Sequence, residues 1–170
     1  TNLSRSRLGI YIAPTTLDGR GPVKMIVDTG SAGTFLNWKG VGDMSMDRSH
    51  PLVSYNTESI GVMGADNNAL ALSHRFVVKR RVNFDSSSGN VGMFAAGLDL
   101  MDPSCQNAEI NVDIGDLPVL ETMKYEGVGG ILGSDILMNC DVVHVTNLID
   151  RGTTPKLTLL KCKDESDSYY

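Results

Sequence analysis

Residues 25–36 read MIVDTGSAGTFL, and the interpretation of the whole chain starts from this stretch. An apolar strand runs directly into Asp28, small residues form a turn, and apolar residues resume at Phe35. A carboxylate at the end of an apolar strand is costly to bury unless its charge is neutralised or stabilised. Backbone N–H groups in a glycine turn can stabilise it, and the hydroxyls of Thr29 and Ser31 can add donors. We therefore expect the turn to hold Asp28 rigidly in a dry place, ready for acid–base chemistry. The alternative is an Asx-turn in which Asp28 only caps its own loop.

Length and composition limit the classes of protein to consider. The chain has 170 residues, enough for one domain, and 41% hydrophobic with 21% charged residues excludes collagen-like, disordered and coiled-coil proteins. No apolar run approaches the roughly 18 residues of a membrane helix, so we expect a soluble protein without a membrane partner. The formal net charge of -5 argues against a nucleic-acid partner.

The cysteines give neither a disulfide framework nor a metal site. Their number is odd and their spacing is not that of metal ligands, so we expect reduced thiols, no metal and no cofactor at Cys105, Cys140 and Cys162, although one pair could still form a disulfide. Reduced thiols favour an intracellular or organellar compartment. The first residue is Thr rather than Met, which suggests a processed chain whose targeting peptide cannot be seen.

The hydrophobic pattern is mainly that of strands and turns. Asp18 and Gly19 supply hairpin chemistry between two apolar runs, and residues 109–114 alternate polar and apolar, as a half-buried strand does. Further strands are expected at 75–84, 141–145 and 156–160, with a short helix at 134–139. We expect a flexible segment at 1–7, one domain at 8–162 and a disordered acidic tail at 163–170.

A second motif lies far along the chain, where Ile131, Leu132 and Gly133 lead into Asp135 and two apolar residues. An Asp-Thr-Gly-Ser turn after an apolar strand, followed later by this apolar-apolar-Gly crossing, resembles the retropepsin-like aspartic proteases. The resemblance covers about residues 8–160. It implies a mainly β, retropepsin-like acid protease fold, with a flap hairpin and one short helix near the C-terminus.

The resemblance also implies an activity and an assembly. A single Asp-Thr-Gly turn would make the chain one protomer of a homodimer, an aspartic endopeptidase acting on peptide or protein substrates. Asp28 from each subunit would form a dyad that shares one proton and activates a water molecule. Thr29 would brace the two loops across the interface, and Gly30 would allow close backbone approach. Ser31 could donate to the carboxylate, which would favour an acidic activity optimum.

The region between the two motifs departs from compact viral members of the family. It is longer, which implies insertions, and the candidates are 41–51 and 85–105. The flap would fall on a hairpin around Met63, Gly64 and Ala65, although these residues could equally form an ordinary surface hairpin.

Other chemistries find less support in the sequence. No base is near Ser31 or Ser134, the histidines lack metal spacing, and the glycines of 127–133 fit neither a phosphate loop nor a dinucleotide fingerprint. Two alternatives to the homodimeric protease remain open: a non-catalytic dimerisation or peptide-binding module of the same fold, and one half of a larger monomeric enzyme.

Overall fold

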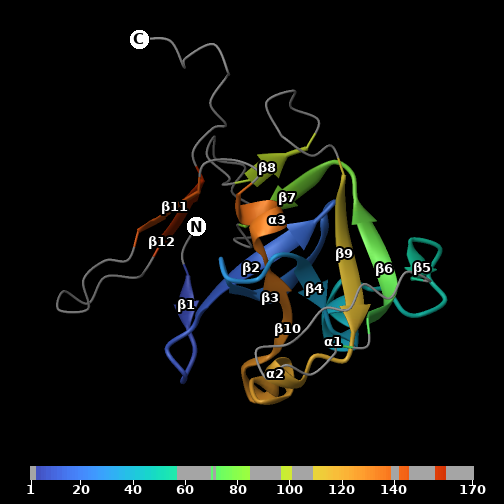
Figure 1. The fold of residues 1–170 in the computed structure, drawn as a ribbon, viewed down its shortest axis with the longest axis horizontal. Helices are drawn as coiled ribbons and strands as arrows, with labels where there is room; N and C mark the ends of the chain where they lie inside the picture. The colour runs from blue at the N-terminus through green and yellow to red at the C-terminus, as the bar shows by residue number, and fades with distance from the viewer. Residues whose placement is uncertain are drawn as a thin grey trace, which may run out of the picture.

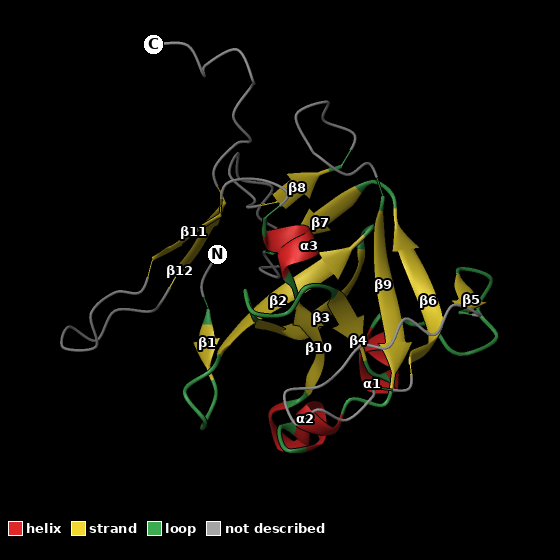
Figure 2. Cartoon of the chain, in the orientation of Figure 1, coloured by secondary structure: helices red, strands yellow, loops and turns green. Residues whose placement is uncertain are grey.

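The computed structural model describes residues 3–56, 70, 72–84, 97–100, 109–138, 142–145 and 156–159. Strands dominate these residues and the helices are short, so the predicted mainly β class is confirmed (Figure 2). The strands are β1 Ser4–Arg5, β2 Tyr11–Leu17, β3 Arg20–Val27, β4 Thr34–Leu36, β5 Val53–Tyr55, β6 Leu72–Val78, β7 Arg81–Asn83, β8 Gly97–Asp99, β9 Ile110–Gly115, β10 Val128–Leu132, β11 Val142–Val145 and β12 Lys156–Leu159. The helices are α1 Trp38–Asp43, α2 Pro118–Glu121, the 3-10 turn Lys124–Glu126 and α3 Ser134–Leu137.

One large sheet positions the candidate site. Its strand order is β5-β6-β9-β4-β10-β3-β2-β7-β8, and β1 pairs with β2 off this path. β10 lies between β3, to which it is parallel, and β4, to which it is antiparallel. Among the described strands β5 and β8 are the two ends, so the sheet is open. Figure 1 shows β11 and β12 as a separate antiparallel pair beside this sheet.

The β2–β3 hairpin forms as its sequence predicts. Asp18 and Gly19 both have positive φ, 49° and 77°, which a two-residue hairpin turn of the primed type requires. The Asp18 carboxylate also accepts the backbone N–H groups of residues 79–81 at 2.8, 2.8 and 2.9 Å. This contact anchors a bend that breaks the single strand expected over 75–84 into β6 and β7.

Apolar side chains pack against both faces of the central strands. The larger cluster includes fully buried Met25, Leu36 and Phe76, and the smaller one contains Ile26 and Phe35. A strand that is buried on both faces loses the simple alternation of polar and apolar residues.

Two segments that the sequence gives as flexible or as a candidate insertion make contacts with the sheet and its core. Residues 3–5 are held by the sheet, because β1 pairs with β2 and Leu3 is only 2% exposed in the main core. The segment 41–51 is partly helical, since α1 begins after Asn37, whose side chain accepts the N–H of Gly40 at 2.9 Å. Its Val41, Met44 and Met46 are buried, so these three residues belong to the core, whereas most of the other residues of the segment are exposed. Nearly all of the other candidate insertion, 85–105, lies outside the described residues, as do the acidic tail and the three cysteines.

Candidate active site

The Asp28 loop is tied to the sheet at its root. The N–H of Asp28 donates to the carbonyl of Leu132 on β10 at 3.1 Å, which extends the β3–β10 pairing by one residue. Asp28 Oδ1 accepts the N–H of Gly30 at 2.9 Å, and the N–H of Ser31 donates to the Asp28 carbonyl at 3.2 Å. The loop is therefore the tight glycine turn that the sequence predicts, with one carboxylate oxygen held by the backbone.

The environment of the carboxylate differs from the expectation. In the single chain Asp28, Thr29 and Gly30 are exposed, so one chain alone provides no dry site. Within the described part of the chain, Gly30 N–H is the only hydrogen-bond donor to this carboxylate.

Ser31 does not donate to Asp28, so that prediction is wrong. Its hydroxyl proton goes to the carbonyl of Gly33 at 2.8 Å, which closes the second half of the loop. The argument for an acidic activity optimum from this hydroxyl therefore falls. Thr29 likewise makes no hydrogen bond to Asp28 among the described residues, and the residue is exposed.

The second motif, residues 131–133, packs against the Asp28 loop, as the order of the two motifs suggests. Leu132 is fully buried in the main core, and Ile131 pairs with Phe35 of β4. Gly133 lies so close to the loop that a Cβ there would be 2.1 Å from the carbonyl oxygen of Gly33. A side chain at this position would force the two segments apart.

The helix α3 adds further contacts to the same loop. The N–H of Ser134 donates to the carbonyl of Ser31 at 2.8 Å, and its hydroxyl donates to the carbonyl of Ala32 at 3.2 Å. Together with the Asp28 contact to Leu132, these bonds fix both halves of the loop to the segment that follows β10. The backbone of the loop is thus held in place by residues distant in sequence.

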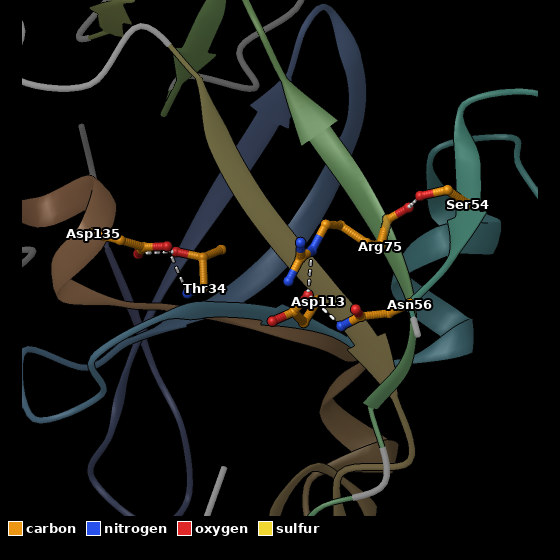
Figure 3. Close-up of polar contacts among 6 residues, drawn as sticks. All are labelled: Thr34, Ser54, Asn56, Arg75, Asp113 and Asp135. Carbon is orange, nitrogen blue, oxygen red and sulfur yellow. Dashed lines mark hydrogen bonds and ion pairs between the residues drawn. The ribbon is translucent and has the colours of Figure 1, made fainter. Parts of the chain in front are cut away.

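The main contact that sequence reasoning missed joins Thr34 to Asp135 (Figure 3). Thr34 donates to the Asp135 carboxylate through its hydroxyl at 2.6 Å and through its N–H at 2.9 Å. The same hydroxyl accepts the N–H of Gly133 at 3.0 Å. Burial raises the pKa of Asp135, and the hydrogen bonds from Thr34 and from the N–H of Ile136 act in the opposite direction. The one feature of the sequence that could have indicated this contact is Asp135 itself, an acidic residue in the first turn of the helix that follows Gly133.

The proposed flap residues Met63, Gly64 and Ala65 lie outside the described residues. The strands on either side of that segment are described, and they pair antiparallel with Tyr55 opposite His74. This pairing shows that the chain reverses direction between β5 and β6.

The described part of the chain contains neither a cluster of metal ligands nor a membrane-spanning helix. No group of three or more His, Cys, Asp or Glu residues there could hold a metal ion. None of the helices described is long and apolar enough to cross a bilayer.

Comparisons with known proteins found similarity in structure only. No family model matches the chain, and no curated protein sequence matches it. A solved retropepsin-like aspartic protease from Rickettsia conorii aligns with 86% of this chain and 83% of its own length, with 15% identity and a TM-score of 0.48. The retroviral protease-like domain of Ddi1 from Leishmania major aligns with 91% of this chain and 97% of its own, with 15% identity and a TM-score of 0.38.

Proposed function

We propose that this chain is one protomer of a homodimeric aspartic endopeptidase of the retropepsin-like type. The observation that carries the proposal is the Asp28 loop: a carboxylate held by Gly30 N–H at the end of a strand and bound at its root to β10. A carboxylate that is held by one backbone N–H and is exposed in one chain fits a group that meets a partner from a second chain.

A second copy would complete the site. Two Asp28 carboxylates brought within hydrogen-bond distance across a two-fold axis cannot both be ionised, so they share one proton. The ionised member takes a proton from a water molecule, which attacks the peptide carbonyl, and the protonated member donates to the carbonyl oxygen. Contact between the two loops would also remove the exposure that the single chain shows.

The neighbouring residues take supporting roles in this proposal. Gly30 holds one Asp28 oxygen, and exposed Thr29 is available to contact the partner's loop. The segment between β5 and β6, with Met63 to Ala65, covers the substrate as a flap. The pair of β11 and β12 contributes to the dimer sheet, because an isolated two-stranded hairpin is only marginally stable in water.

Digestion of a mixed peptide library across a range of pH, with and without pepstatin, tests the proposal. Wild-type protein should cleave peptides and pepstatin should inhibit cleavage, whereas Asp28→Asn should lose turnover and keep the wild-type molar mass by light scattering. A monomeric mass for active wild-type protein would refute the homodimer. Absence of cleavage by wild type, or equal cleavage by Asp28→Asn, would favour the non-catalytic peptide-binding module.

A further inference from the structure

Strand register aligns one residue from each of seven neighbouring strands in a row across the large sheet. Residues paired in register place their side chains on the same face of a sheet. The row runs, from β2 to β5, through Ile12, Ile26, Ile131, Phe35, Asp113, Arg75 and Ser54.

This row lies on the face that Asp28 also occupies. Side chains alternate along a strand, so Ile26 and Asp28, two residues apart, point to the same side. Val27 between them packs against the main core on the opposite side, whereas Ile26 belongs to the smaller cluster. The residues of the row are therefore next to the carboxylate along β3 and extend away from it toward β6.

The row changes from apolar to charged at β9 and β6. Arg75 Nε donates to Asp113 Oδ1 at 2.8 Å, and Asn56 Nδ2 donates to the same oxygen at 3.4 Å (Figure 3). The side chains of Arg75 and Asp113 are only 19% and 13% exposed. Taking an ion pair this far out of water costs free energy that the pair's own attraction scarcely offsets, so stability alone is a weak reason for it.

The hydrogen bonds within the ion pair leave the terminal nitrogens of Arg75 available to bind a ligand. Arg75 uses only Nε, and within the described part of the chain its terminal nitrogens have no hydrogen-bond partner. A guanidinium fixed through Nε keeps four N–H donors in a planar arrangement that matches a carboxylate with two parallel hydrogen bonds. Asp113 is less exposed than Arg75, and one of its oxygens already accepts two donors. The pair is therefore better suited to bind an anion than a cation.

We propose that Arg75 is a specificity-determining residue that binds an acidic side chain of the peptide substrate. This inference rests on the proposed protease function and adds a substrate class to it. From β3 to β6 the sheet has four strand spacings, at most about 19 Å, and an extended peptide covers that distance in roughly five or six residues. The length of the two side chains shortens the span, so the acidic residue is expected about three to five positions from the cleaved bond.

Paired peptides provide the test. Once a cleaved sequence is known, each position within about five residues of the cleaved bond is made Glu in one peptide and Gln in its pair, and kcat/KM is measured for wild type and for Arg75→Gln. Wild type should cleave the Glu peptide about tenfold faster at one of these positions, as expected for a charge-assisted pair of hydrogen bonds. Arg75→Gln should reduce this ratio to about one. Because both peptides are cleaved by the same variant, their ratio cancels any general loss of activity that follows from breaking the ion pair with Asp113.

The matched control is Lys79→Gln, which removes a cation from the end of the same strand. Lys79 pairs with Glu109 at 3.4 Å, and both side chains are more than half exposed. This variant should keep the wild-type ratio of Glu to Gln peptide. The proposal is overturned if wild type shows no Glu preference, if Arg75→Gln retains it, or if Arg75→Gln loses activity on both peptides equally, which would make Arg75 structural. Absence of any cleavage by wild type would refute the protease function itself, and this inference with it.

Discussion

We predict that removing the Thr34 hydroxyl, which contacts Asp135, lowers the free energy of unfolding more than removing the hydroxyl of another buried threonine does. Thr34→Val keeps the shape of the side chain and replaces its hydroxyl with a methyl group. That change deletes a 2.6 Å bond to the Asp135 carboxylate and leaves the buried N–H of Gly133 without its acceptor. Hydrogen bonds to charged groups contribute about 1.5–3 kcal/mol, and an unsatisfied buried donor costs about 1–3 kcal/mol. Since the two effects overlap and valine is more apolar, we expect a net loss of about 2–4 kcal/mol.

Urea denaturation monitored by the fluorescence of Trp38 measures this loss. With a slope of about 2 kcal/mol per M, the midpoint should fall by about 1–2 M urea. All variants must be compared at one protein concentration, because dimerisation adds to the apparent stability.

A second fully buried threonine provides the control. The Thr15 hydroxyl makes one long bond, donating to the carbonyl of Ala13 at 3.3 Å. Thr15→Val should change the free energy of unfolding by less than about 1 kcal/mol. If the two substitutions had equal effects, the large contribution to stability assigned to the contact between Thr34 and Asp135 would be wrong.

Three further predictions follow from the same contacts. Gly133→Ala should destabilise the protein by about 1–3 kcal/mol or more and lower peptide cleavage, because its Cβ would meet a backbone oxygen at 2.1 Å. Its control is Gly42→Ala, whose Cβ would have no atom within 4 Å. This control should be neutral or slightly stabilising in the same urea and activity assays. Asp18→Ala should lower the urea midpoint by the equivalent of about 1–2 kcal/mol, because three N–H groups of residues 79–81 lose their acceptor, and an unchanged midpoint would contradict this. Burial raises the pKa of Asp135, so the folded chain binds this proton more tightly than the unfolded chain does. The resulting stabilisation is complete below the ordinary carboxyl pKa and is lost as pH rises through the raised pKa. The free energy of unfolding of wild type, relative to that of Asp135→Asn, should therefore decrease as pH rises above about 4. An increase measured by urea midpoints would contradict the raised pKa of Asp135.

Features that depend on a few neighbouring residues could be predicted from the sequence. The turn at Asp18 and Gly19, the alternating strand β9 and the helix after Gly133 all formed where local patterns placed them. The bend at residues 79–81 could not be predicted, because the group that stabilises it is the Asp18 carboxylate from another part of the chain. The burial of Leu3 could not be predicted either, because it depends on the pairing of β1 with β2, and the polar residues next to Leu3 do not suggest a strand.

For the candidate site, the sequence by itself determined that one carboxylate follows an apolar strand and enters a glycine turn, since those features require only adjacent residues. Only the tertiary structure decided that Asp28 is exposed in one chain, that Ser31 donates to Gly33, and that Asp135 binds Thr34. The register of β9 with β6, which pairs Asp113 with Arg75, was likewise invisible in the sequence. These contacts depend on which strands become neighbours, and that order is set by the packing of the whole sheet rather than by the preferences of any one segment.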